Sequence, residues 1–174
     1  LSLLTTFLYI MVYTPMKRTS WLNTTVGAIP GAMPPLGGWA AATGHLNFDA
    51  GILFLILFIW QHPHFYSIAW MYKEDYKDGG FQMLPVVEPD GKRMFKHIMF
   101  YSYILIPVSV VPFFTGLSSY IYFIGALVIG ILLLLTSKNF AVSHSIIDAR
   151  HLLKATVFYL PVLLILIIVD QIVL

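Results

Sequence analysis

Long apolar segments, separated by a few clusters of basic residues, constrain this chain more than any other feature of its sequence. Its ten Lys and Arg residues fall into three groups, with two apolar segments between each group and the next. The groups are Lys17 and Arg18; Lys73, Lys77, Lys92, Arg93 and Lys96; and Lys138, Arg150 and Lys154. Because a pair of membrane spans returns a chain to the side where it started, the spacing predicts a membrane protein with all three groups on one side.

The composition agrees with this prediction. Hydrophobic residues make up 59% of the chain and charged residues only 10%, which excludes an ordinary soluble domain. Apolar windows of about 20 residues, enough to cross a hydrocarbon core of roughly 30 Å, predict six spans. They lie near residues 1–13, 21–43, 51–71, 97–115, 120–137 and 155–173. The connections at 43–50 and 116–119 contain no Lys or Arg, so the positive-inside rule assigns the basic groups to the cytoplasm or matrix.

We therefore expect an all-α fold, a polytopic transmembrane helical bundle that forms a single integral membrane domain over residues 1–174. The absence of Cys excludes disulfides, thiolate metal sites and covalent c-type haem attachment. A net charge of +2 is too small to indicate binding to nucleic acid. Because the chain starts at Leu1 without an initiator Met or a charged leader, we expect it to be the C-terminal fragment of a longer protein.

The second predicted span contains many residues that weaken a helix. Gly27 and Gly31 recur at four-residue spacing, which allows a neighbouring helix to approach closely. Three prolines remove backbone donors and should kink the span: Pro30, Pro34 and Pro35. A bent packing helix and a cavity-lining helix are both compatible with this pattern.

The third predicted span carries two histidines, His62 and His64, on either side of Pro63. Pro63 cannot donate a hydrogen bond to the carbonyl of Ile59, so we expect a bend there with a free acceptor. Residues two apart on a helix point to nearly opposite sides, so the two imidazoles can face one ligand only if that bend reorients them. Each is either a ligand contact or a hydrogen-bonded core histidine.

Acidic and basic residues alternate where the third span leaves the membrane. If the helix continues to Asp78, Asp75 and Asp78 share one of its faces. Two carboxylates beside Lys73 and Lys77 suit Mg²⁺ bound to a diphosphate, because Mg²⁺ takes few protein carboxylates and keeps waters or phosphate oxygens. The alternative is a solvated segment with ion pairs along the helix.

These segments gather cations, carboxylates, imidazoles and aromatic rings near one membrane face. Lys17 and Arg18 mark topology or bind an anion, and composition alone does not distinguish the two roles. A lipid-like substrate with an anionic head fits the combination. Basic residues and Mg²⁺ would hold the head, and aromatic faces would stabilise a carbocation.

Four stretches in order resemble the protoheme IX farnesyltransferase, or haem O synthase, family of the intramembrane aromatic prenyltransferase superfamily. They are residues 13–18, 27–35, 60–65 and 74–86, and the resemblance runs along the whole chain. It implies a bundle of nine spans, of which the last six are present. It also implies the reaction: Mg²⁺-assisted departure of diphosphate from farnesyl diphosphate, attack on the allylic cation by a vinyl group of haem B, and capture of water to give haem O.

The resemblance also implies roles for individual residues. The second Asp-rich motif of the superfamily maps onto Asp75 and Tyr76, which become the catalytic candidates, and the metal candidates are Asp75 and Asp78. The remaining candidates are Lys17, Arg18 and Lys73 for the diphosphate, and His62 and His64 for haem, at its iron or a propionate. No first motif of the Asn-Asp-x-x-Asp type is present, so we expect residues 1–174 alone to be inactive.

Two other functions compete with this interpretation. A prenyltransferase for a quinone or another aromatic acceptor would share the diphosphate chemistry. A non-catalytic haem-binding or proton-conducting subunit would use His62 and His64 as ligands or relay groups. A structural module that docks to a terminal oxidase or to haem A synthase is a third possibility. A bacterial cytoplasmic membrane and a mitochondrial inner membrane are both compatible with the sequence.

Overall fold

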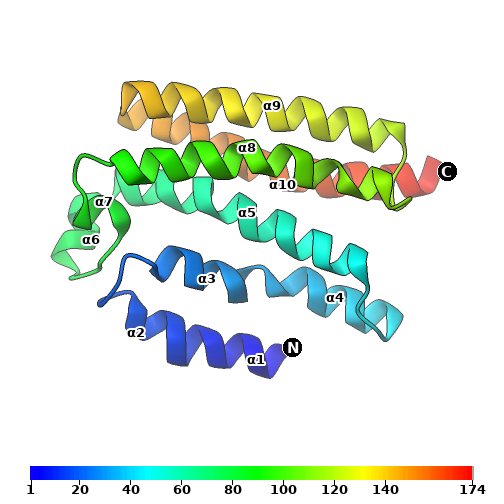
Figure 1. The fold of residues 1–174 in the computed structure, drawn as a ribbon, viewed down its shortest axis with the longest axis horizontal. Coiled ribbons are helices and arrows are strands. Elements are labelled where there is room, and N and C mark those ends of the chain that lie inside the picture. Colours follow the sequence, from blue (N-terminus) through cyan, green and yellow to red (C-terminus); the bar gives the residue numbers. More distant parts are fainter. Residues whose placement is uncertain (174) are drawn as a thin grey trace.

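A computed structural model of the chain describes the backbone of residues 1–173 and the side chains of that range apart from residues 171 and 173. Helices are the regular structure of this part of the chain, and it contains no strand. The helices run roughly parallel or antiparallel to one another, and the short helices α6 (Lys73–Asp78) and α7 (Leu84–Val87) cover one end of the bundle (Figure 1). The prediction of an all-α helical bundle is confirmed.

Four long helices form a closed ring. They are α5 (Phe48–Met71), α8 (Lys92–Phe114), α9 (Tyr120–Ser143) and α10 (Ile146–Val173). Each is long and apolar enough to cross a membrane. Contacts join α5 to α8, α8 to α9, α9 to α10 and α10 back to α5, and large side chains such as Tyr66, Tyr122 and Phe140 fill the interior. Their mutual burial makes this ring the packed core.

A second layer lies against one side of the ring. Its first part consists of α1 (Ser2–Phe7), a π-helical turn η1 (Leu8–Tyr13) and α2 (Thr14–Met16). These elements form one apolar helix, Ser2–Met16, that is shorter than the four long helices. In η1 the Thr14 hydroxyl donates to the Tyr9 carbonyl (2.8 Å), and Pro15 supplies no backbone donor for the ordinary helical bond.

The second part of this layer is the span in which we expected a kink. It is divided into α3 (Asn23–Gly31) and α4 (Met33–Thr43), both of which contact α5. Ala32, with φ −93° and ψ −2°, separates them. Pro34 and Pro35 start α4, where their missing N–H groups cost least. The kink is confirmed. Of the six predicted spans, four are single long helices, the first is a shorter helix, and the second is divided into α3 and α4.

The basic groups differ from the prediction in one respect. We expected them in connecting loops, but Lys138, Arg150 and Lys154 lie on α9 and α10, and α8 begins at Lys92. Predicted spans that ended at 137 and began at 155 were therefore too short. The three side chains on α9 and α10 are exposed, and long cationic side chains can reach the interface from within a helix end.

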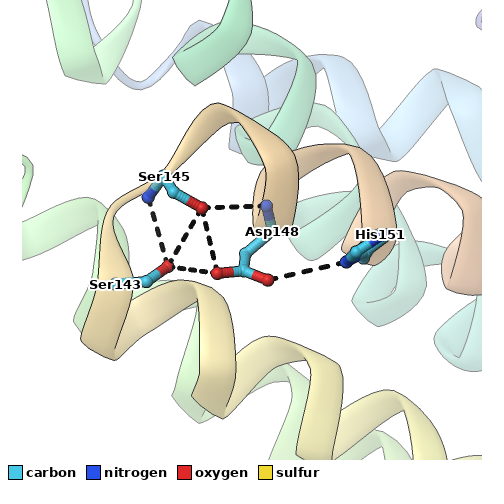
Figure 2. A network of polar contacts seen from close by, with 4 residues as sticks. All are labelled: Ser143, Ser145, Asp148 and His151. Atoms are coloured by element: carbon cyan, nitrogen blue, oxygen red, sulfur yellow. Dashed lines mark hydrogen bonds and ion pairs between the residues drawn. The ribbon is translucent and has the colours of Figure 1, made fainter.

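The turn between α9 and α10 is held by a polar network (Figure 2). Ser145 caps α10, since its hydroxyl accepts from the Asp148 N–H (3.0 Å) and donates to the Asp148 carboxylate (2.9 Å). His151 Nδ1 lies 3.5 Å from the other Asp148 oxygen. The indole of Trp70 on α5 donates to the His144 carbonyl (3.1 Å). The network therefore fixes this turn to the end of α5.

Candidate functional site

A cavity of about 250 Å³ lies between the first helical segment, α3, α5 and the loop that follows α6. Its lining combines aromatic rings, two glycines and a few polar groups. The lining residues are Tyr9, Tyr13, Lys17, Thr24, Gly27, Gly31, Gln61, Phe65, Tyr76, Phe81 and Met83. The cavity thus brings together residues from all four of the stretches that the sequence singled out.

The glycine face of α3 forms one wall of this cavity. A Cβ added to Gly27 would lie 2.5 Å from a ring carbon of Tyr13, and one added to Gly31 would lie 2.4 Å from Gln61 Oε1. Both distances are shorter than real Cβ contacts, so only glycine permits these two side chains to lie there. The predicted close approach is confirmed, and α3 packs and lines a cavity at the same time.

The end of the cavity that carries Lys17, Tyr76, Phe81 and Met83, which we call its mouth, is built from two segments that hydrogen bonds tie together. The Gln82 N–H donates to the Lys17 carbonyl (2.7 Å). The Asn23 amide donates to the carbonyls of Gln82 (2.9 Å) and Ser20 (2.7 Å), and Asn23 is fully buried. Sequence reasoning gave Asn23 no role. The available signal was the amide side chain of Asn23 at the first position of a membrane helix.

Two of the predicted diphosphate and catalytic residues meet at this mouth, and a third lies beside them. Lys17 and Tyr76 both line the cavity, and Lys17 Nζ lies 4.5 Å from the centre of the Tyr13 ring. The Arg18 guanidinium lies 5.9 Å from the ring of Phe81, which packs edge-on against Tyr76. Burial raises the pKa of the Tyr76 hydroxyl, so Tyr76 is a hydrogen-bond donor at neutral pH.

The other residues of that group lie outside the cavity lining. Asp75 and Asp78 are exposed, both on α6. Lys73 Nζ lies 5.1 Å from the Trp70 ring, and Lys73 lines a separate hollow of about 130 Å³. The Lys77–Glu74 pair (3.9 Å) is exposed and contributes little to stability. Asp75 is therefore next in sequence to Tyr76, which lines the mouth. The Lys73 side chain lies against Trp70, outside the cavity.

His62 and His64 point to different neighbours, as their spacing predicted, and α5 runs through Pro63 without interruption. His62 is fully buried and stacks on Tyr101, with ring centres 3.7 Å apart. Its Nδ1 donates to the Phe58 carbonyl (2.9 Å), which leaves Nε2 to accept from Thr25 (3.3 Å). Both nitrogens of His62 are thus occupied by the protein.

His64 differs in having one nitrogen to spare. Its Nδ1 lies 2.9 Å from the Thr156 hydroxyl, whose own proton goes to the Leu153 carbonyl (2.6 Å). Thr156 must therefore accept, and Nδ1 must carry the proton. The lone pair on Nε2 of His64 then stays available for a ligand.

Comparison with known proteins decides the family. The model of the UbiA prenyltransferase family matches residues 1–168. This chain belongs to that family. A protoheme IX farnesyltransferase from Solibacter usitatus is 51% identical over 163 residues, which cover 94% of this chain and 56% of the relative. The Koribacter versatilis enzyme of the same name is 47% identical over 178 residues, 98% of this chain and 57% of that protein.

The similarity extends to an organelle protein, the mitochondrial protoheme IX farnesyltransferase of Arabidopsis thaliana. It is 36% identical over 155 residues, 89% of this chain and 36% of that protein. The chain spans about half the length of these two curated bacterial relatives. No solved structure matches it. The four long apolar helices and the family together identify this UbiA-family chain as an integral membrane protein.

UbiA-family prenyltransferases generally use divalent metal ions. Within residues 1–173 no cluster of three or more His, Cys, Asp or Glu side chains is arranged to hold a metal. Asp75 and Asp78 nevertheless suit Mg²⁺, which binds through one or two carboxylates together with waters and substrate phosphates. The described residues therefore fit a shared metal site rather than a closed protein cage.

The residues of α5 that line the cavity were not among the predicted site residues. They are Gln61 and Phe65, which lie four residues apart and hence on one side of the helix. Sequence reasoning chose the neighbouring histidines because imidazoles are common ligands. The available signal was Gln61 itself, an uncharged polar residue in the middle of an apolar span.

Proposed function

We propose that the protein transfers the farnesyl group of farnesyl diphosphate to a vinyl group of haem B and so produces haem O. The observation that carries this proposal is the cavity itself, where Lys17 and Tyr76 stand at the mouth of an aromatic-lined hollow in a UbiA-family bundle. Relatives named protoheme IX farnesyltransferase support the choice of substrates. A cationic, donor-rich mouth and an apolar interior suit a prenyl diphosphate.

The residues at the mouth would act on the diphosphate. Lys17 and Arg18 would offset its negative charge, and the Tyr76 hydroxyl would donate a hydrogen bond to it. Asp75 and Asp78 would hold Mg²⁺, which neutralises charge on the leaving group when bound. Lys73 remains a predicted contact, although reaching the diphosphate requires its side chain to leave Trp70.

The cavity interior would act on the prenyl chain. Rings of Tyr9, Tyr13 and Phe65 line it, and aromatic faces attract a positive charge such as an allylic cation. The cavity walls would also keep bulk water away from the cation until the new carbon–carbon bond has formed.

We further propose that His64, rather than His62, contacts haem. His64 Nε2 has a free lone pair, and Thr156 holds the ring in the required tautomer. A second hydrogen bond of this kind commonly orients a histidine that binds a metal. His62 would first have to give up its bond to Thr25.

The membrane in which the protein works is part of the same proposal. Bacterial relatives and a mitochondrial one support a bacterial cytoplasmic or a mitochondrial inner membrane. A terminal oxidase or haem A synthase, which would consume haem O, is the expected partner.

The test is haem extraction and mass analysis from cells that cannot make haem O and that express the protein from its complete gene. Wild type should yield haem with an added hydroxyethylfarnesyl group, and Asp75→Asn should yield none while accumulating normally. Asp90→Asn is the matched control, because Asp90 lies on the same membrane side but pairs only with Lys92 at the surface. No farnesylated haem from accumulated wild-type protein would refute the proposal and favour a quinone acceptor or a non-catalytic haem protein.

A further inference from the structure

Gln61 is the buried polar group of the cavity that the proposed roles leave unused. Its side chain is 5% exposed and lines the cavity. Its amide makes no side-chain hydrogen bond with any residue that the structure describes. An amide in an apolar site is costly unless something bonds to it, so a bound molecule is the natural partner.

The amide lies at the inner end of the cavity, away from the diphosphate. Helix α3 begins beside the mouth, and the lining residues Thr24, Gly27 and Gly31 follow it inward. At 1.5 Å per residue, Gly31 lies about 10 Å deeper than Thr24. The Gln61 amide packs against Gly31, so it is placed beyond the leaving group, toward the acceptor.

Tyr13 provides a second polar group of the cavity, one helical turn of α3 nearer the mouth. The Tyr13 ring packs against Gly27, one helical turn or about 6 Å from Gly31. Its hydroxyl likewise forms no hydrogen bond within residues 1–173. A water molecule bonded to two groups holds them roughly 4.5 to 5.5 Å apart, which the ends of side chains packed on neighbouring turns can reach. A water in an apolar cavity needs polar partners of this kind.

We propose that Gln61, together with Tyr13, holds the water that completes the reaction, an inference that rests on the proposed farnesyl transfer. The terminal vinyl carbon bonds to C1 of the farnesyl group as the C1–oxygen bond to diphosphate breaks. The positive charge then resides on the vinyl carbon attached to the porphyrin. The oxygen of the held water bonds to that carbon, and its extra proton passes to the released diphosphate.

The Gln61 carbonyl oxygen accepts a hydrogen bond from this water and so turns a lone pair of the water toward the cation. Tyr13 supplies the second contact. If the water is not held, the same cation loses a proton from the adjacent carbon to diphosphate instead. The product is then an alkene that is lighter than the alcohol by one water.

The test measures the ratio of dehydrated to hydroxylated farnesyl haem by mass analysis. Gln61→Met and Tyr13→Phe keep the approximate shape of each side chain and remove the hydrogen bond. With the protein expressed from its complete gene, each should raise the dehydrated fraction about five- to tenfold, as expected for the loss of one hydrogen bond. Asn139→Leu is the matched control and should keep the wild-type ratio, because Asn139 is an exposed amide on α9 and does not line this cavity.

Wild-type ratios in both active variants would overturn the inference. The inference would also be overturned if Gln61→Met accumulates but makes no farnesylated haem while Tyr13→Phe keeps the wild-type ratio, because Gln61 would then act before the transfer. If Gln61→Met fails to accumulate, the ratio in Tyr13→Phe decides. If the wild-type protein makes no farnesylated haem, the proposed function itself is refuted. That result differs from the outcomes above, in which the wild type is active.

Discussion

The closed ring of α5, α8, α9 and α10 and the layer of α1 to α4 use polar side chains in opposite ways. In the ring, buried hydroxyls pair with one another: Ser102 with Ser137 (2.8 Å), and Ser109 with Tyr159 (2.7 Å). In the layer, Gly27 and Gly31 open a hollow whose polar groups include the unbonded amide of Gln61. Satisfied polar pairs hold helices together in a membrane, whereas unsatisfied ones mark a place for a ligand.

Helix α5 belongs to both regions. Its Gln61 face lines the cavity, while Trp60 donates to the Thr156 carbonyl on α10 (2.8 Å). The ring thereby anchors one wall of the hollow. The comparison predicts that changes in the layer alter activity more than stability, and that changes in the ring do the reverse.

Among the changes that test this comparison, the largest effect is expected from Lys17→Gln. Loss of the cationic side chain that lines the cavity should lower kcat/KM for farnesyl diphosphate about 100-fold, as for other groups that stabilise a developing charge. Lys138→Gln on α9 is the control, because Lys138 is exposed and belongs to the ring. Steady-state kinetics of both variants check this, and equal losses would contradict the division between the two regions.

His64→Ala should affect haem more than farnesyl diphosphate. Removing the free Nε2 should weaken haem binding about tenfold, the equivalent of roughly 1.4 kcal/mol, and leave binding of farnesyl diphosphate nearly unchanged. Optical titration with haem, run beside a titration with the diphosphate, measures both affinities. His151→Ala, at an exposed position near the α9–α10 turn, is the control. Haem titration curves that coincide for wild type and His64→Ala would count against the contact.

Gly27→Ala should damage the cavity more than the fold. Its Cβ would displace the Tyr13 ring, so we expect about 1–3 kcal/mol of strain and lower turnover. Gly38→Ala on α4 is the matched variant, because nothing lies within 4 Å of its added Cβ, and it should stabilise by about 0.5–1 kcal/mol. Thermal melting in detergent separates them, and equal melting temperatures would show that Tyr13 moves at no cost.

Ser102→Ala in the ring should have the smallest effect on activity, because its effect should be confined to stability. It breaks the buried bond to Ser137 and should cost about 1–3 kcal/mol, since a buried hydroxyl is left unpaired. Adding Ser137→Ala should cost less than the sum of the single changes. Denaturation of the three variants measures the coupling, and strictly additive losses would mean that the hydroxyls do not act as a pair. Turnover should stay at the wild-type level in each.

The sequence allowed much of the ring to be predicted, because span length and apolar composition depend on residues close together in the chain. The helix break near Ala32 also followed from local prolines. The end of α9 at Ser143 and the start of α10 at Ile146 were missed, because charged residues were taken to mark the ends of spans, whereas long cationic side chains extend to the interface from within a helix.

The site was predicted less completely. Lys17 and Tyr76 were named from motifs and do meet at the cavity. Asn23 and Gln61 were missed because their roles depend on partners far away in sequence, such as Gln82, which Asn23 reaches across 59 positions. No local pattern encodes such a contact.

The Asn23 amide has a further consequence for how a substrate is received. One buried side chain joins the loop after Lys17 to the loop after Tyr76, so both sides of the cavity mouth keep their spacing before any ligand arrives. The entropy of bringing them together is lost during folding rather than at each encounter. The mouth is in this sense preorganised, and a single amide that bonds to backbone carbonyls would set how much of the attraction for a ligand becomes affinity.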